Sequence, residues 1–331
     1  MKFISLFSGI GGFDLGLERA GMTCRAQVEI DKAARGVLAH HWPDVERITD
    51  VTKAGKHNLP AVELICGGFP CQDVSIAGRR AGLDGERSGL WFEFARIVDE
   101  LKPQWVLIEN VPGLLSSNAG QDFKVILDGL VKFGYGVCWR ILDAQYFGLA
   151  QRRKRLFIVA SLGNGRSAQV LFERESSTGN SATGGETRQE LARDIAATLR
   201  SRGENTGTRS DFEVGLAVVG TLAASGAGDD SQWQTGKNNG HKSGGAKQII
   251  RAGDYVGALN ATKQDAIAYA QGVRRLTPVE CERLQGFPDQ WTASSNGKPQ
   301  ADSARYKQLG NAVAVPVAEW IAHRIMAVTS R

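Results

Sequence analysis

The sequence has few cysteines and no long hydrophobic run, and each absence argues against a class of protein. Its five cysteines include no Cys-x-x-Cys pair, which argues against a disulfide framework or a zinc site and for a reducing compartment. No apolar segment of about 18 residues is present, so we expect no membrane span. The apolar amino terminus stops at Gly9, which is too early for a signal peptide. These absences predict a cytoplasmic protein that holds no metal.

The composition that is present is globular, with a surplus of glycine and of positive charge. The 331 residues are 42% hydrophobic and 23% charged, which suffices for a large core in one domain or in two unequal ones. A net charge of +5 permits a polyanionic partner without requiring one. The forty glycines exceed average usage, so the segments in which they cluster are the informative ones.

A glycine turn follows the first apolar segment. Residues 2–7 are a strand candidate, Ser8-Gly9-Ile10-Gly11-Gly12-Phe13 comes next, and a helical stretch runs to Ala20. Glycines let a backbone approach a ligand closely, and a helix amino end favours negative charge. The spacing is not the dinucleotide pattern G-x-G-x-x-G. A ligand-binding turn and a plain strand-to-helix connection both remain open.

Acidic residues end the next two strand candidates. The segment Thr23–Glu29 ends in a carboxylate that would suit a ribose diol, and Asp31 could cap a helix over 32–41. The segment 48–51 places Asp50 at a third strand end. Asp50 could accept a hydrogen bond from the amine of adenine, or it could simply be a turn residue.

A Pro-Cys pair stands behind two glycines at Gly67-Gly68-Phe69-Pro70-Cys71-Gln72, directly after the apolar run 62–66. This composition predicts a thiol on an exposed turn at the carboxyl end of a strand, where an open α/β sheet carries its chemistry. The cysteines at positions 24, 66, 138 and 281 are instead expected to be small buried hydrophobic residues. Residues 72–89 are polar and glycine-rich, which predicts a mobile lid beside Cys71.

Two further segments place charge at strand ends. The apolar run 105–108 ends in Glu109, whose pKa burial would raise so that it holds a proton. The alternative is a salt-bridged glutamate. The basic run Gln151-Arg152-Arg153-Lys154-Arg155 enters the strand candidate 156–160. A basic run is usually a solvated face, but alternation along a strand places Arg153 and Arg155 on one side.

The amino-acid composition of the chain changes between about 162 and 272, where long apolar runs are absent. Disorder is one interpretation of parts such as 224–248, and the basic piece 237–247 could contact a phosphate backbone. Order returns at Thr277-Pro278-Val279-Glu280, a capping box that predicts a helix start. A last amphipathic helix is expected from Pro316 to Met326.

Six of these segments, in this order, resemble the motifs of the DNA cytosine-5 methyltransferases. The matching segments are Phe7-x-Gly9-x-Gly11-Gly12, Gly68-Phe69-Pro70-Cys71-Gln72, Glu109-Asn110-Val111, Gln151-x-Arg153-x-Arg155, Arg275-Leu276-Thr277-Pro278-x-Glu280 and Gly310-Asn311-Ala312-Val313. The resemblance covers 1–161 and 273–331. It implies an α/β fold in which these ranges form a Rossmann-like, S-adenosylmethionine-dependent methyltransferase domain with a mostly parallel sheet. Residues 162–272 would form a smaller, irregular target-recognition domain.

The resemblance also implies a role for each matching residue. Cys71 would add to carbon-6 of cytosine, Glu109 would protonate N3, Arg155 would bind O2, and Arg153 would brace the site or contact a phosphate. The implied cofactor-binding residues are Phe7, Gly9, Gly11, Gly12, Glu29, Ile30, Asp50, Val51, Pro70, Leu90, Asn311 and Val313. The implied DNA-binding residues are Gln72, Ser75, Arg79 and Arg87.

The implied partner is double-stranded DNA with the target cytosine flipped out of the helix. We expect a monomer without metal or membrane, encoded by a bacterium or phage, associated with the nucleoid and accompanied in some hosts by a cognate restriction endonuclease. An RNA cytosine methyltransferase is the nearest alternative, but the strings Thr-Cys-Pro-Pro-Cys and Cys-Phe-Thr are absent. An amino-methylating DNA enzyme would need a Pro-Pro pair, which is also absent. Intact Cys71, Glu109 and Arg155 argue against a catalytically idle DNA-binding module.

Overall fold

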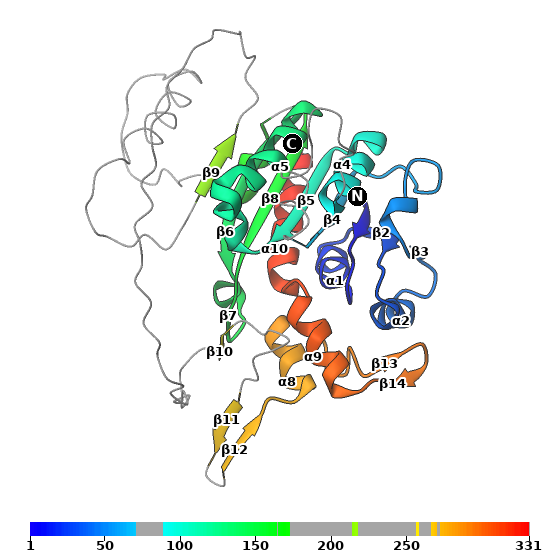
Figure 1. Cartoon of the computed structure of the whole chain (residues 1–331), viewed down its shortest axis with the longest axis vertical. Coiled ribbons are helices and arrows are strands. Elements are labelled where there is room, and N and C mark those ends of the chain that lie inside the picture. The colour runs from blue at the N-terminus through cyan, green and yellow to red at the C-terminus, as the bar shows by residue number, and fades with distance from the viewer. Residues whose placement is uncertain are drawn as a thin grey trace, which may run out of the picture.

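The computed structural model describes residues 1–70, 89–163, 165–172, 214–217, 256–257, 266–269 and 272–330. The predicted lid (apart from Gly89) and the basic piece 237–247 lie outside these residues. The centre of the described structure is one eight-stranded sheet (Figure 1). Its strands are β1 (Lys2–Leu6), β2 (Thr23–Val28), β3 (Glu46–Ile48), β4 (Leu64–Gly67), β5 (Trp105–Asn110), β6 (Tyr135–Asp143), β8 (Lys154–Leu162) and β9 (Val214–Ala217).

The strand order is β3-β2-β1-β4-β5-β8-β6-β9. The first five strands in this order are parallel, whereas β8, β6 and β9 pair antiparallel. The predicted α/β fold with a mostly parallel sheet is therefore confirmed. The connections run outward in opposite directions from β1 and β4, and such a switch point opens a crevice at the carboxyl ends of the strands.

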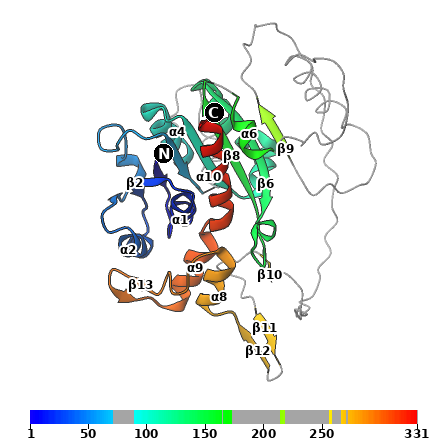
Figure 2. The ribbon, with the colours of Figure 1, turned by 180° about the vertical axis from the view of Figure 1, so that it is seen from behind.

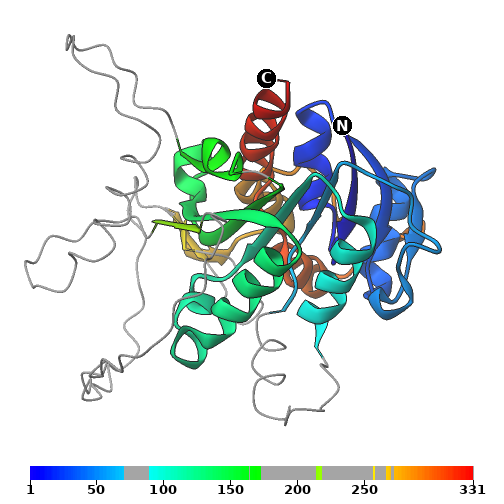
Figure 3. The same cartoon turned by 90° about the horizontal axis from the view of Figure 1, so that it is seen from above.

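Alternate residues of the central strands face two separate apolar cores. Phe3 and Leu107 face helices α1 (Gly12–Arg19), α6 (Ser167–Leu171) and α10 (Val315–Thr329). Ile4 and Val106 face helices α4 (Leu90–Leu101) and α5 (Gln121–Lys132) on the other side. This period-two pattern buries both faces of the sheet and gives three layers (Figures 2 and 3).

A third apolar cluster joins the carboxy-terminal part of the chain to Ile10 in the glycine turn and to the helix that follows β2. It packs α2 (Lys32–His41) against α8 (Pro278–Gln285) and α9 (Asp302–Asn311). The indole N–H of Trp291 donates to the carbonyl of Ile10 over 2.9 Å, and the ring of His41 stacks on Trp291 with centroids 3.4 Å apart. The carboxy-terminal segment thereby lies against the glycine turn.

The short elements complete the description. They are the 3-10 turns η1 (Val51–Lys53), η2 (Pro112–Leu115), η3 (Ser117–Gly120) and η4 (Ala144–Phe147), and the strand pairs β7 (Gln151–Arg152) with β10 (Val256–Gly257), β11 (Ala266–Tyr269) with β12 (Gly272–Arg275), and β13 (Ser294–Ser295) with β14 (Lys298–Pro299).

Most predicted elements occur within two residues of their expected bounds. Asp31 caps α2 by accepting a hydrogen bond from the Ala34 N–H at 2.8 Å, and the capping box at Thr277 and Glu280 is present. The third strand was predicted at 48–51 but covers 46–48. Asp50 and Val51 instead form the start of η1, because the Asp50 carboxylate accepts the Thr52 N–H and turns the chain.

Two described segments bear on the region 162–272. Helix α6 lies beyond the predicted boundary at residue 161, yet its Val170 and Leu171 belong to the core of the sheet-bearing domain. Strand β9 extends the sheet at its β6 edge. The division of the chain into a catalytic and a recognition domain stays a prediction.

One stretch, Asp302–Thr329, is long and apolar enough to cross a membrane by length and composition alone, which the sequence reading had not anticipated. It spans α9 and α10, and half of its most apolar window is buried inside the protein. Ile321 and Ile325 of α10 are fully buried against α1 and the sheet, as in the core helix of a globular protein.

Candidate active site

A cavity of about 670 Å³ opens at the carboxyl ends of the parallel strands. Its size lies within the range of small-molecule sites, roughly 300–1,000 Å³. Twelve residues predicted to bind cofactor or to act in catalysis line it together, namely Phe7, Gly9, Glu29, Ile30, Asp50, Val51, Pro70, Leu90, Glu109, Arg153, Arg155 and Asn311. The structure therefore brings to one place side chains that lie as much as 300 residues apart in the chain.

Glu29 connects the glycine turn to the end of β2. Its two carboxylate oxygens accept the backbone N–H groups of Gly9 at 2.8 Å and of Asp31 at 2.7 Å. Each oxygen retains a second lone pair. A carboxylate fixed in this way can accept further hydrogen bonds from two vicinal hydroxyl groups, which is the requirement for holding a ribose.

Asp50 and Ile30 border the same half of the cavity. The Oδ1 atom of Asp50 accepts from the N–H and the hydroxyl of Thr52 at 3.0 and 2.8 Å, and these bonds lower the pKa of Asp50. Asp50 is thus an ionised acceptor. Ile30 leaves 73% of its surface exposed at the cavity wall, where a flat apolar ring could cover it. Together with Glu29, these residues offer carboxylate acceptors and an apolar surface, which fit the ribose and adenine of the expected cofactor, S-adenosylmethionine.

Gly11, Gly12 and Val313 do not line the cavity, and packing explains both glycines. A side chain at Gly12 would stand 2.5 Å from the carbonyl oxygen of Val313. Gly11 has φ +85°, and a side chain there would meet the ring of Trp42 at 2.5 Å. Close packing against Val313 and Trp42 therefore explains why glycine stands at these two positions. Their predicted contact with the cofactor stays a prediction.

The other half of the cavity is lined by charged side chains. Glu109 on β5 and Arg155 on β8 form an ion pair of 3.0 Å between Oε1 and Nε, with only 12% and 18% of the side chains exposed. The two strands are antiparallel, with Asn110 opposite Leu156, so their side chains meet across the sheet. Burial raises the pKa of Glu109, against the opposing effect of Arg155 and Arg153.

Arg153 is almost fully buried, and its guanidinium faces the end of α9. Its Nη2 donates to the carbonyls of Gly310 at 3.1 Å and Ala312 at 2.8 Å. Burial also lowers the pKa of Arg153 to about 10. Of the two roles considered for Arg153, bracing the site is the one that these contacts favour over contact with a phosphate.

Asn110 was not assigned a role from the sequence, although it stands in the quoted segment Glu109-Asn110-Val111. Its buried amide donates to the carbonyl of Phe69 at 3.0 Å and so ties the end of β5 to the chain that leaves β4. Gly68 lies against the glutamate, because a side chain there would be 3.0 Å from Glu109 Oε2. Thr49, Lys307 and Gln308 also line the cavity and were not anticipated.

Pro70 lines the cavity and is followed directly by Cys71. Cys71 and the predicted DNA-binding residues Gln72, Ser75, Arg79 and Arg87 lie outside the described residues. The remaining cysteines, 24, 66, 138 and 281, are free and buried, which confirms that they are small core residues.

Solved methyltransferases share this fold, in which the sheet order turns at β1 and β4 and a cavity opens at the carboxyl ends of the strands. A solved putative DNA modification methyltransferase encoded within a prophage of E. coli has this fold, with a TM-score of 0.64 at 21% identity over the whole of both chains.

The family model for C-5 cytosine-specific DNA methylases matches residues 1–327, so the chain belongs to this family of DNA-methylating enzymes. The type II methyltransferase M2.BsuMI of Bacillus subtilis is 32% identical over 98% of this chain and 75% of its own length. A protein of Escherichia phage P1 with the name DNA N-6-adenine-methyltransferase is 30% identical over 99% of this chain and 61% of its own length.

Proposed function

We propose that this chain transfers a methyl group from S-adenosylmethionine to carbon-5 of a cytosine that is flipped out of a specific duplex DNA sequence, through a covalent adduct with Cys71. One observation carries the proposal. The Glu109–Arg155 pair and the carboxylates Glu29 and Asp50 line a single cavity, and Pro70 at its wall is followed by the candidate nucleophile. In this proposal, one part of the cavity binds a nucleotide and the other part binds a polar ring.

The chemistry explains why these residue types are needed. Carbon-5 of cytosine is too weak a nucleophile to take a methyl group unaided. The Cys71 thiolate would add to carbon-6, and the electron pair that moves into the ring would make carbon-5 nucleophilic. Protonated Glu109 would donate to N3, where negative charge would otherwise collect. Arg155 would donate to O2 as charge develops there.

The second half of the reaction restores the aromatic ring. The proton on carbon-5 would leave to water, the electron pair of that bond would expel the Cys71 thiolate from carbon-6, and the proton on N3 would return to the Glu109 carboxylate. Arg153 would take no direct part. Its hydrogen bonds to the carbonyls of Gly310 and Ala312 would hold the end of α9 against the charge pair.

S-adenosylmethionine supplies an electrophilic methyl group when it is bound. Glu29 would hold the ribose hydroxyls, Ile30 would cover one face of adenine and Asp50 would accept from the adenine amine. Phe7, at φ +55°, would stack near the same ring. A bulky residue in the left-handed region is strained, and such strain is common where a turn must present a side chain to a ligand.

A cytosine inside a duplex is out of reach, so it must be flipped into the cavity. Gln72, Ser75, Arg79 and Arg87 would fill the gap or hold the backbone, and the target sequence would be selected by 162–272. We propose that the enzyme is a cytoplasmic monomer. We also propose that it belongs to a restriction–modification system, as the name of the type II relative suggests. A cognate endonuclease would then cut the same sequence.

The test is methyl transfer from tritiated S-adenosylmethionine to duplex DNA by the wild type, by Cys71→Ser and by Cys281→Ala. Cys281 is a buried core cysteine outside the cavity, so its variant should stay active. We expect label in DNA for the wild type, none for Cys71→Ser, and 5-methylcytosine in the digested product. Label in Cys71→Ser DNA would overturn the covalent mechanism. N6-methyladenine as the product would overturn the proposed substrate atom, as the name of the phage P1 relative makes worth checking.

A further inference from the structure

The wall of the cavity that contains Asp50 and Val51 has little structure of its own. It is the start of η1, a single 3-10 turn of three residues between β3 and the segment that leads to β4. Two backbone hydrogen bonds hold the turn, from Lys53 N–H to the Asp50 carbonyl and from Ala54 N–H to the Val51 carbonyl. So short a turn depends on contacts with other elements for its position.

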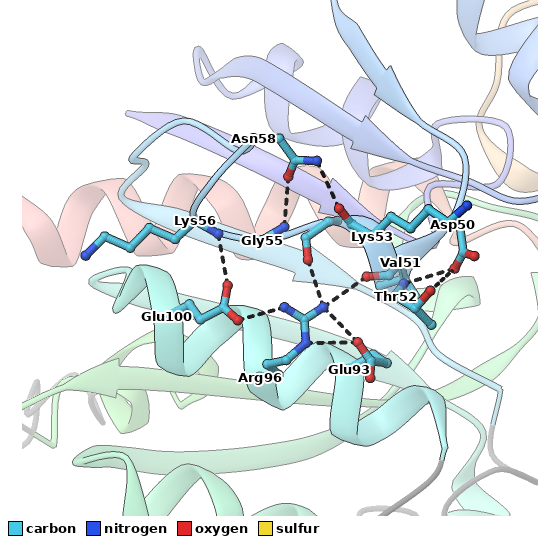
Figure 4. Close-up of polar contacts among 11 residues, drawn as sticks. Asp50, Val51, Thr52, Lys53, Gly55, Lys56, Asn58, Glu93, Arg96 and Glu100 are labelled. Carbon is cyan, nitrogen blue, oxygen red and sulfur yellow. Dashed lines mark hydrogen bonds and ion pairs between the residues drawn. The ribbon is translucent and has the colours of Figure 1, made fainter.

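Arg96 of α4 provides that contact. Its Nη2 donates to the carbonyl of Val51 at 3.2 Å and to the carbonyl of Ala54 at 2.8 Å. Figure 4 shows the guanidinium between the helix and the segment 50–58. Both carbonyls that bracket η1 therefore point at one side chain from another element.

The guanidinium is itself held on its own helix. Glu93 accepts from Nε at 3.0 Å and from Nη2 at 2.7 Å, and Glu100 accepts from Nη1 at 2.7 Å. The second oxygen of Glu100 accepts the backbone N–H of Lys56 at 2.9 Å, so the far end of the same segment is tied to the same helix. These partners lie one turn before and one turn after Arg96, which fixes the fork in one orientation.

This hydrogen-bonded network is important for its position beside the cavity rather than for its contribution to stability. About one third of each side chain in it is exposed, and ion pairs that exposed contribute little to stability. Yet the carbonyl that it holds belongs to Val51, which lines the cavity directly beside Asp50. Leu90, at the amino end of the same helix, lines the cavity too. Helix α4 thus positions two parts of the cavity wall.

We infer that Arg96 is a positioning residue for the adenine end of the cofactor site, where it sets the place from which Asp50 accepts the adenine amine. The inference rests on the proposed function, since it requires that the cavity binds S-adenosylmethionine. Lysine cannot replace Arg96 here, because one ammonium group cannot bridge two carbonyls and two carboxylates in fixed directions.

The experiment compares binding of S-adenosylhomocysteine with that of S-inosylhomocysteine, in which a carbonyl oxygen replaces the adenine amine, by titration calorimetry. A hydrogen bond to a charged acceptor predicts that the wild type prefers the adenosyl compound by about tenfold or more. We expect Arg96→Lys to reduce that preference by about threefold or more. The melting temperature should change by about 3 °C or less, because the pairs are exposed.

Arg283→Lys is the matched control. Arg283 also forms a forked ion pair, with Asp289, but it does not line or support the cavity, so its variant should keep the wild-type preference. Glu100→Gln serves as a second variant that weakens the hold on the guanidinium, and it should give a smaller loss of preference than Arg96→Lys. If Arg96→Lys does not fold, the preference of Glu100→Gln for the adenosyl compound tests the inference instead.

The outcomes separate this inference from the proposed function. Weaker binding of both compounds by Arg96→Lys with an unchanged preference would show a merely structural role and overturn the inference. A wild type that binds both compounds equally would also overturn it. A wild type that binds neither would instead overturn the proposed cofactor. Turnover at saturating S-adenosylmethionine should differ by less than about twofold between wild type and Arg96→Lys, because the change concerns cofactor binding.

Discussion

The half of the cavity that we propose for the cofactor, lined by Glu29 and Asp50, holds its carboxylates with backbone N–H groups. The half that we propose for the chemistry holds Glu109 with an arginine instead. Glu29 and Asp50 stand at the ends of parallel strands, where successive loops lie side by side and offer N–H groups. Glu109 stands on β5, whose antiparallel partner β8 brings Arg155 across from it. The direction of strand pairing thus decides which kind of group each carboxylate meets.

The difference reverses the effect on acidity. Hydrogen bonds at the surface lower the pKa of Asp50, whereas burial raises the pKa of Glu109 even though an arginine lies beside it. An ionised acceptor suits the recognition of hydroxyl and amine groups, and a protonated acid suits the donation of a proton. The same type of side chain can therefore serve binding in one half and proton transfer in the other.

The largest effect is expected in the chemical half, at Glu109. Glu109→Ala should lower the rate of methyl transfer by about 10³-fold, within the range of general acid catalysis. Since the protonated form is active and burial raises its pKa, the wild-type rate should fall as pH rises through that pKa. Glu109→Gln, which can donate a hydrogen bond but not a proton, should lack this alkaline decline. Single-turnover rates over the pH range in which the protein stays folded measure it, and an unchanged profile in Glu109→Gln would contradict the role.

A second large effect is expected at Asp14, a fully buried carboxyl on α1 that does not line the cavity. Asp14 accepts from Ser5 and Gln27 at 2.9 Å, yet burial outweighs these hydrogen bonds and raises its pKa from 3.8 to about 6. Below pH 4 both the folded and the unfolded chain are protonated, so the loss of folding free energy accumulates as pH rises from about 4 to 6. The shift corresponds to on the order of 3 kcal/mol.

Asp14→Asn should remove this penalty. Its free energy of unfolding at pH 7, from urea titration, should exceed that of the wild type, and the difference should vanish near pH 4. A variant that is less stable than the wild type at both pH values would show that the hydrogen bonds to Ser5 and Gln27 matter more than the buried charge.

The smallest effect is expected at Glu29, in the half of the cavity that we propose for the cofactor. Glu29→Gln replaces one acceptor oxygen by an amide that faces a backbone N–H, so it should weaken binding of S-adenosylhomocysteine by about tenfold. The rate at saturating S-adenosylmethionine should stay near that of the wild type, because Glu29 lies in the binding half. Titration calorimetry and initial rates measure the two quantities. A loss of rate without a loss of affinity would place Glu29 with the chemistry instead.

Local patterns in the sequence predicted the sheet and much of the site. The apolar runs predicted β1, β4 and β5 because nearly every residue of these strands is buried, so no polar alternation obscures them. Strand β2 was predicted as well, although it alternates exposed Thr23 and Arg25 with buried Cys24 and Ala26. The acids at their ends could be expected to converge because parallel strands end at one edge. Helix α9 was not predicted, since its sequence has little apolar periodicity, and β3 was misplaced because it is short and polar.

Contacts between distant segments could not be predicted in the same way. The ion pair of Glu109 with Arg155 depends on the antiparallel register of β5 and β8, which neither strand encodes alone. Gly12 was interpreted as a ligand contact because nothing local reveals that the backbone of Val313 lies against it. Arg96 was assigned no role from the sequence, and only the position of η1 shows what it holds.

Helix α10 has a consequence for how the protein is made. It covers the apolar side of α1, where Leu17 is completely buried in a core shared with Ile321 and Ile325. Residues of α1 leave the ribosome about 300 residues before α10 does, at roughly 5–20 residues per second. For something like half a minute of synthesis, the nascent chain must keep that surface from associating with other molecules. The cavity wall formed by the start of the chain therefore receives its supporting core only when residues 315–329 have emerged.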